Sequence, residues 1–212
     1  MSFFPRGVPL SKRIFDLLLT LVGMIVVVPL MGVIGLLVWI KHGRPIFFRQ
    51  RRPGYRGEPF YVTKFRTMVD SYDLDGSPLP DEQRITGLGM FLRASSLDEL
   101  PELFHVLSGQ MSLVGPRPLL MRYLDRYTME QARRHEVLPG ITGWAQVNGR
   151  NILTWEDKFR LDVWYVDNWS LRLDVKILAL TFLTVVGREG ISQPGHATAE
   201  EFMGSEPGDE TN

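Results

Sequence analysis

The chain has 212 residues, of which 44% are hydrophobic, and its 24 basic side chains balance its 24 acidic ones. A chain of this length builds one ordinary hydrophobic core, so a single domain is expected. It contains no cysteine, which excludes a disulfide framework and a thiolate metal or redox site. Carboxylates, Arg, Lys, His and hydroxyl groups are left for any chemistry.

Near the N-terminus, residues 17–40 form an apolar run of 24 residues without a charge. At ~1.5 Å per residue, a helix of this length can cross a hydrocarbon layer of ~30 Å. The run therefore predicts a membrane segment. A cleaved signal peptide is the competing interpretation, but the run is too long for one, and no small-residue cleavage site precedes Lys41.

Pro29 lies in the middle of this run, where it removes a helix hydrogen bond. Each half is then only ~17 Å long, too short to cross the bilayer alone. Both flanks are basic, which favours the cytoplasmic side for both ends. The flanking residues are Arg6, Lys12, Arg13, Lys41, Arg44, Arg49, Arg51 and Arg52. We predict that residues 1–44 form a re-entrant, helix-break-helix membrane hairpin broken at Val28 and Pro29; a proline-kinked span is the alternative.

The next segment predicts a β-hairpin, because residues 45–52 and 59–68 are rich in aromatic and β-branched side chains and flank a turn with two glycines. Residues 70–89 are rich in Asp, Gly, Pro and Ser, which is typical of a surface loop. The pattern beyond them is helical. Two helices are predicted over 95–107 and 118–127. Three more are predicted to begin at a capping box formed by Thr128 and Gln131, at an N-cap at Thr154 and at an N-cap at Ser170.

The last of these helices contains an apolar run of ten residues, 177–186. It is too short to span a membrane and predicts a core or interfacial helix. Residues 191–212 are rich in Gly, Pro, Ser and acids and predict a disordered tail. Because five acids and no Lys or Arg fall within 196–212, the rest of the chain is mildly basic, which suits an anionic ligand or lipid. We predict a mostly helical, single-domain α+β fold with a catalytic domain over 45–190 and interfacial amphipathic helices.

Asp98 and Glu99 are adjacent at a predicted helix start. A structural explanation exists, because Ser96 and Glu99 have the spacing of a capping box. Pro101 would lose a backbone bond in a helix that begins at Ser96, which favours a start nearer Asp98. The free N–H groups at a helix start favour phosphate as well as carboxylate, so the pair is also a candidate for phosphate chemistry.

Several cations accompany this pair: Lys64, Arg66, Arg93, Arg117 and Arg150. Arg117 lies between two prolines, which limits its loss of entropy on binding, and a guanidinium matches phosphate oxygens in pairs. Any one of these side chains is more often a surface ion-pair partner. Together with two carboxylates and a membrane segment, they predict pyrophosphate chemistry at a lipid surface.

Four motifs then give a resemblance: KFRTM at 64–68, SLDELP at 96–101, SLVGPRP at 112–118 and PGITGW at 139–144. With the proline-containing apolar segment, they resemble the bacterial sugar transferases. The match is closer to the small monotopic phosphoglycosyl transferases, of which the Campylobacter glycosylation enzyme PglC is an example. The resemblance covers about residues 10–190. Family members commonly carry Ser-Pro where this chain has Val-Pro, and larger members carry further helices and a domain.

This resemblance implies a reaction. Asp98 would attack the β-phosphate of a UDP-sugar, release UMP and carry a covalent phosphosugar; polyprenyl (undecaprenyl) phosphate would then attack that intermediate. It also implies Mg²⁺ as the cofactor, a hard ion suited to one or two carboxylates and phosphate oxygens. The implied catalytic residues and Mg²⁺ ligands are Asp98 and Glu99, and the implied substrate-binding residues are Lys64, Arg66, Arg93, Arg117, Gln146, Asn148 and Arg150.

The resemblance further implies a bacterial inner-membrane enzyme with its catalytic domain on the cytoplasmic face, catalysing the first membrane step of glycoconjugate assembly. Membrane lipid is an expected partner, nucleic acid is not, and a homodimer is compatible with an exposed apolar surface. Two other functions are open at this point: a non-catalytic membrane-anchored scaffold, and a phosphohydrolase of lipid diphosphates. The sugar is not predicted.

Overall fold

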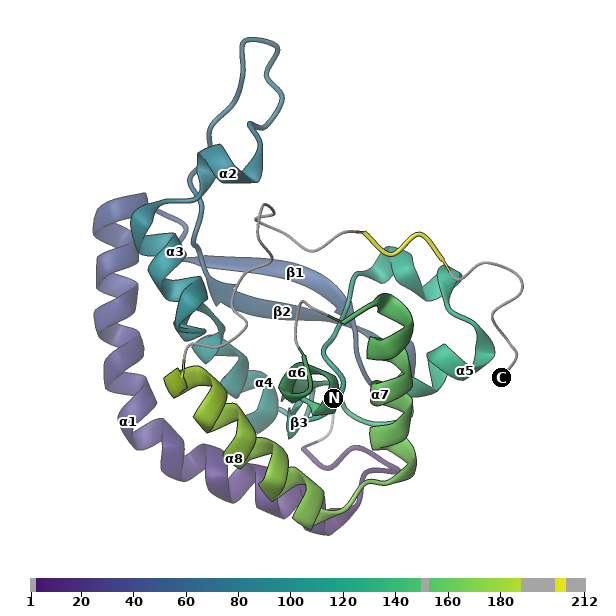
Figure 1. The fold of residues 1–212 in the computed structure, drawn as a ribbon. Helices are drawn as coiled ribbons and strands as arrows, with labels where there is room; N and C mark the ends of the chain where they lie inside the picture. Colours follow the sequence, from purple (N-terminus) through teal and green to yellow (C-terminus); the bar gives the residue numbers. More distant parts are fainter. Residues whose placement is uncertain (1–2, 150–152, 188–200, 205–212) are drawn as a thin grey trace.

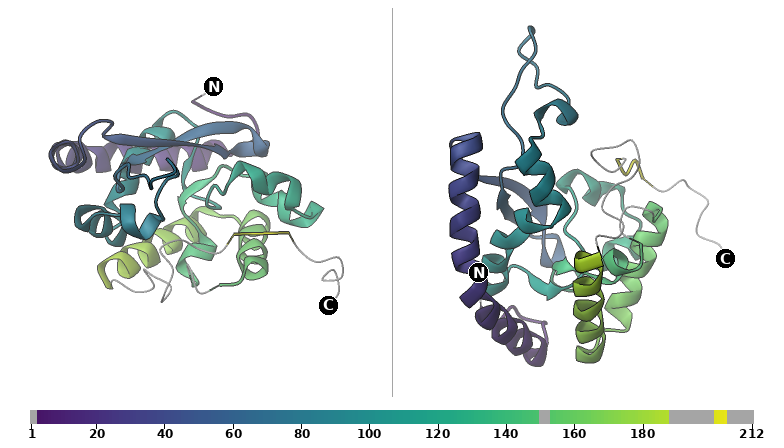
Figure 2. Two further views of the ribbon diagram at one scale, coloured as in Figure 1. Left: turned by 90° about the horizontal axis from the view of Figure 1, so that it is seen from above. Right: turned by 60° about the vertical axis from the view of Figure 1, so that its left-hand side comes forward.

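A computed structural model of the chain describes residues 3–149, 153–187 and 201–204. The long helix α1 (Leu10–His42) runs along one side, and the strands and shorter helices form a body packed against it (Figures 1 and 2). This is the mostly helical α+β architecture that the sequence predicts, with one long apolar N-terminal helix.

The helix α1 differs from the prediction in one respect. It is continuous from Leu10 to His42, with Pro29 inside it, so the predicted helix-break-helix is wrong as to the break at Val28 and Pro29. The helix is bent instead, as Figure 1 shows. A proline removes one hydrogen bond and is a usual cause of such a bend, while the bonds around it keep the helix intact. The re-entrant topology stays a prediction.

Most of α1 is exposed. In its most apolar 18-residue window only 17% of the residues are buried in the protein, whereas the core helix of a soluble domain would be mostly covered. Ile25 and Val26 are examples, with 75% and 72% of their surface exposed. So large an apolar surface is stable in lipid rather than in water, and α1 indicates membrane association.

The predicted β-hairpin is confirmed. Strands β1 (Phe47–Pro53) and β2 (Pro59–Phe65) pair antiparallel, and the short 3₁₀ helix η1 (Tyr55–Gly57) joins them. A second small sheet pairs β3 (Ser112–Val114) with β4 (Gly140–Thr142) in parallel. Its two strands belong to two of the sequence motifs, which are thereby brought side by side.

The remaining helices are short until the C-terminal part of the chain. The predicted caps of the later helices are confirmed. Thr128 and Gln131 form a capping box, and Thr154 is an N-cap. The hydroxyl of Ser170 accepts a bond from the N–H of Leu173. The bounds are α2 (Asp81–Arg84), α3 (Gly87–Ala94), η2 (Leu97–Glu102), α4 (Leu103–Leu107), η3 (Met121–Arg126), α5 (Met129–Ala132), η4 (Arg133–His135), α6 (Trp144–Val147), α7 (Trp155–Asp167) and α8 (Leu171–Gly187).

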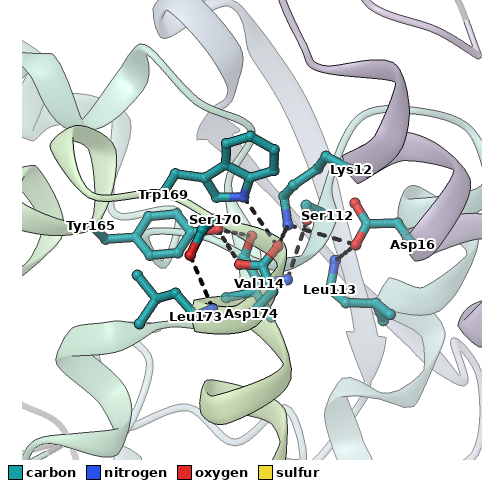
Figure 3. Close-up of polar contacts among 10 residues, drawn as sticks. All are labelled: Lys12, Asp16, Ser112, Leu113, Val114, Tyr165, Trp169, Ser170, Leu173 and Asp174. Carbon is teal, nitrogen blue, oxygen red and sulfur yellow. Dashed lines mark hydrogen bonds and ion pairs between the residues drawn. The ribbon is translucent and has the colours of Figure 1, made fainter.

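A buried polar network joins the start of α1 to α8 (Figure 3). Asp174, which is fully buried, accepts bonds from Lys12 at 2.8 Å, Tyr165 at 2.7 Å and Trp169 at 3.1 Å. Lys12 also lies 3.7 Å from Asp16. Beyond this anchor Ile177 is buried, whereas Phe182 and Leu183 are exposed. One face of α8 is therefore core and the other is open, as an interfacial helix requires.

Most of the segment predicted as a disordered tail, 191–212, lies outside the described residues. Within Glu201–Gly204, which the structure describes, Phe202 is buried against Tyr123 and Phe159. The carboxylate of Glu201 lies 2.9 Å from the guanidinium of Arg126. These four residues are placed by aromatic and ionic contacts with the body.

Candidate functional site

The candidate site is built on η2, which lies beside β2. Ser96 adopts a left-handed conformation with φ of 57° and makes no side-chain cap bond, so the capping box at Ser96 and Glu99 is wrong. The backbone turns sharply there, and η2 begins at Leu97 as a 3₁₀ helix that contains Pro101. The structural explanation of the acidic pair as helix caps therefore has no support from the geometry.

Asp98 is 8% exposed and accepts no hydrogen bond from any residue that the structure describes. Burial raises the pKa of its carboxyl to about 6, and the neighbouring Glu99 adds to the shift, while Lys64 and Arg117 oppose it. A carboxylate without hydrogen bonds keeps its lone pairs available. Asp98 thus has the features of a carboxylate nucleophile.

Glu99 is held differently. Arg117 grips both of its oxygens, with Nη1 at 3.2 Å from Oε2 and Nη2 on Oε1, and Lys64 donates to Oε1 at 2.5 Å. Burial alone would raise the pKa of Glu99, but the two cations outweigh it and hold the pKa well below its usual range. Glu99 is therefore ionised and serves to arrange Lys64 and Arg117.

Glu102 is a member of this cluster that sequence reasoning missed. It is 3% exposed and lies 3.2 Å from the ammonium of Lys64. Burial raises its pKa, and the repulsion by Glu99 adds to this although Lys64 opposes it. Its spacing of three residues from Glu99 puts both acids on one side of η2, which was the available signal.

The placement of Arg117 depends on glycine. A Cβ on Gly115 would lie 2.2 Å from the carbonyl oxygen of Leu138, and one on Gly140 would lie 2.1 Å from the nitrogen of Gly115. The two motif loops thus pack backbone against backbone. Gly140 donates to the carbonyl of Pro116 at 3.0 Å, which fixes the chain just before Arg117.

Arg93 reaches the same region from α3. Its Nε donates to the hydroxyl of Thr67 at 3.0 Å, and its charge lowers the pKa of Asp98. No carboxylate pairs with Arg93 among the residues that the structure describes. Its guanidinium is therefore less neutralised than that of Arg117.

Other predicted site residues do not join this cluster. Arg66 donates to the carbonyls of His42 and Arg44 at the end of α1. Gln146 donates to the carbonyl of Ile141 at 3.0 Å, and Asn148 donates to its own helix. The predicted residue Arg150 lies outside the described residues.

Mg²⁺ was predicted at Asp98 and Glu99. No group of three or more His, Asp or Glu side chains suited to a metal occurs in the part of the chain that the structure describes. One or two carboxylates are enough for Mg²⁺ when phosphates supply the other oxygens. Asp98 meets this requirement with its free oxygens, whereas both oxygens of Glu99 are held by cations. The donor set fits a substrate-dependent Mg²⁺ site.

The arrangement can carry out phosphoryl transfer. It offers one unpaired carboxylate, and beside it an ammonium and two guanidinium groups that can balance charge on phosphate oxygens. Leu97 and Leu100 of η2 pack against a core cluster that includes Ile34 and Val38 of α1. The candidate site therefore lies beside the membrane-associated helix, and its charges suit a phosphorylated substrate.

Comparison with known proteins agrees with this chemistry. A model of the bacterial sugar transferase family matches residues 8–188. The sugar transferase EpsL of Bacillus subtilis is 62% identical over 168 residues, which are 79% of this chain and 83% of EpsL. The UDP-glucose:undecaprenyl-phosphate glucose-1-phosphate transferase of Xanthomonas campestris is 41% identical over 84% of this chain. The undecaprenyl-phosphate galactose phosphotransferase of Salmonella typhimurium is 38% identical over 84% of it.

These last two relatives are much longer proteins. The matched part of this chain spans 39% of the Xanthomonas enzyme and 41% of the Salmonella enzyme. The candidate site lies within the matched part.

Proposed function

Because the chain belongs to the bacterial sugar transferase family, we propose that it transfers a sugar-1-phosphate from a UDP-sugar to polyprenyl phosphate. The substrates are those of the longer relatives, whose names give undecaprenyl phosphate as the acceptor. The single observation that carries the proposal is the unpaired, buried carboxylate of Asp98 beside cations held in place by Glu99.

The reaction is proposed to run in two displacements. A carboxylate oxygen of Asp98 attacks the β-phosphorus of the UDP-sugar, and the bond from that phosphorus to the bridging oxygen breaks, so that UMP leaves. A phosphate oxygen of the polyprenyl phosphate then attacks the same phosphorus. The Asp98 oxygen leaves as the carboxylate, and polyprenyl-diphosphate-sugar is formed.

The surrounding residues have separate tasks in this scheme. Lys64, Arg93 and Arg117 stabilise the charge on the phosphate oxygens in the transition state. Glu99 holds two of these cations before the substrate arrives. Of the two carboxylates predicted as Mg²⁺ ligands, Asp98 would hold the ion together with substrate phosphates, since both oxygens of Glu99 are bound by Lys64 and Arg117; the ion would neutralise the departing nucleotide.

The test is to incubate the detergent-solubilised protein with UDP-sugars, Mg²⁺ and a short polyprenyl phosphate. We expect UMP and a lipid diphosphate-sugar as products. A panel that includes UDP-glucose and UDP-galactose identifies the sugar, since these are the hexoses in the names of the relatives. Lipid binding without UMP release would favour a scaffold, and phosphate release from polyprenyl diphosphate without a nucleotide sugar would favour a phosphohydrolase.

The rate of the first displacement should depend on pH through Asp98, which must be ionised to attack. Its pKa is raised to about 6 without Mg²⁺, and Mg²⁺ bound to this carboxylate lowers the value. The rate should therefore be constant above pH 7 and fall about tenfold per pH unit below a midpoint at or below pH 6. A single-turnover measurement of UMP release without acceptor isolates this step from the titration of the lipid phosphate. A rate that is highest at low pH and falls as Asp98 ionises would contradict the assignment.

We also propose that both ends of α1 lie on the cytoplasmic face of the inner membrane, so that the bent helix dips into one leaflet. The support is the basic character of both flanks and the bend of the helix. The chain has no cysteine, so single cysteines at Phe3 and Ser77 can report the two sides. In sealed, oriented vesicles a membrane-impermeant maleimide should label both positions from the same face. Labelling from opposite faces would show that α1 spans the membrane.

A further inference from the structure

A buried ion pair lies next to the candidate site and contacts the backbone of Arg117. Arg134 in η4 is 3% exposed, and Asp162 in α7 is 4% exposed. One carboxylate oxygen of Asp162 accepts bonds from Arg134, from Nη2 at 2.7 Å and from Nε at 3.1 Å. A buried pair of this kind does not by itself add much stability, because desolvation offsets its attraction. The role of the pair is therefore to be sought in the contacts that it makes with neighbouring residues rather than in the stability that it adds.

The guanidinium of Arg134 has one contact that points to the site. Its Nη2 donates at 2.8 Å to the backbone carbonyl of Arg117. Pro118, the next residue, has no N–H with which to hold the chain. The peptide before Arg117 is fixed by the bond from Gly140 to Pro116, and the carbonyl after it is fixed by Arg134. Arg117 is thus held on both sides.

The orientation of Arg134 is itself restricted. Its guanidinium lies over the rings of Tyr127 and Phe159, at 5.8 and 5.7 Å from their centroids, and its Nη1 donates to the Tyr127 hydroxyl at 3.3 Å. A planar guanidinium can make all these contacts at once, whereas the ammonium of lysine cannot. The charge alone is therefore not sufficient at this position.

We propose that Arg134, oriented by Asp162, is a positioning residue for Arg117. It holds the backbone of Arg117 in place and so directs the Arg117 guanidinium toward Glu99 and the substrate phosphate. The inference rests on the proposed function, since it assigns Arg117 to the phosphate. A small displacement of a phosphate-binding group lowers the reaction rate strongly, because the group stabilises the transition state only when it is correctly positioned against the phosphate oxygens.

The neighbouring residue provides a matched control. Arg133 also lies in η4 and also pairs with an acid of α7, Asp167, but both partners are at the surface. The side chain of Arg133 bonds to Glu130 and Asp167 and has no hydrogen bond to Arg117. The pairs Arg134–Asp162 and Arg133–Asp167 therefore join the same two helices, and only the first reaches the site.

The experiment compares Arg134→Lys, Arg117→Lys, their double variant and Arg133→Gln by UMP release. We expect Arg134→Lys to lower kcat/KM about ten- to a hundredfold and Arg133→Gln to change it less than about twofold. The two lysine substitutions should not add, because Arg134 acts through Arg117. The double variant should be about as active as Arg117→Lys alone.

Additive losses would overturn the proposal, since a purely structural role lowers activity independently of Arg117. Equal losses in Arg133→Gln and Arg134→Lys would also overturn it. If Arg134→Lys does not fold, Asp162→Asn keeps the arginine and removes only its charged partner, and it enters the same cycle with Arg117→Lys. The proposed function is tested separately, because its failure would show as no UMP release from the wild-type protein.

Discussion

Replacing Asp98 by Asn should abolish UMP release, with a loss on the order of 10⁴-fold or more in kcat, as expected when a nucleophile is removed. The amide has almost the same shape as the carboxyl group but cannot form the acyl phosphate. In the wild-type protein incubated with UDP-sugar alone, a phosphosugar should be found by mass spectrometry on the peptide that contains Asp98. The variant should lack this adduct.

The same substitution should leave the fold intact or make it more stable. The pKa of Asp98 is raised from 3.8 to about 6, so its ionised form is disfavoured in the folded protein, and stability falls as the pH rises through this interval and stays lower above it. An uncharged amide removes this cost, about 1–3 kcal/mol at neutral pH. Asp98→Asn should therefore raise Tm at pH 8 while it abolishes activity. Full activity in this variant would exclude Asp98 as the nucleophile.

Replacing Asp174 by Ala should have the largest effect on stability. Asp174 accepts bonds from Lys12, Tyr165 and Trp169 in the closed network of Figure 3. Without its carboxylate, the buried ammonium of Lys12 has Asp16 as its remaining carboxylate neighbour, at 3.7 Å. Breaking one side of a buried pair typically costs about 3–5 kcal/mol. We expect a large fall in Tm of the detergent-solubilised protein and loss of assembled protein from membranes.

Asp167→Ala is the matched control for this prediction. Asp167 pairs with Arg133 at the surface, where ion pairs contribute about 0–1 kcal/mol. Its removal should shift Tm only slightly. If the two alanine variants were equally stable, α1 would not be anchored to the body through Asp174.

The local features of the fold could be predicted from the sequence because neighbouring residues produce them. The β-hairpin follows from alternation around a glycine turn, and the caps at Thr128 and Thr154 follow from side chains that bond to nearby N–H groups. The cap at Ser96 failed although its spacing was right. There the tertiary packing of η2 beside β2 holds the residue in a left-handed conformation, and the local preference is overridden.

The site was predictable as a set of residue types but not as a set of contacts. Asp98, Glu99, Lys64, Arg93 and Arg117 come together as predicted. Glu102 was missed, because its spacing from Glu99 places it on the same side of η2 but does not show that this side is buried. Arg66 was predicted with Lys64 on the same strand, yet it turns to the end of α1, where the carbonyls of His42 and Arg44 are free to accept its bonds.

The apolar helix, the acidic pair and the family could all be recognised from residue types and their order along the chain. Which charged side chains lie next to one another depends on how the chain folds. Arg133 and Arg134 are adjacent and chemically identical, yet one is at the surface and the other is buried behind Arg117. That difference depends on how η4 packs on α7. Contacts of this kind join residues far apart in the sequence, and they produce no periodic pattern from which they could be predicted. The free carboxylate of Asp98 likewise depends on contacts between distant residues, because Lys64 and Arg117 donate to Glu99 and not to Asp98.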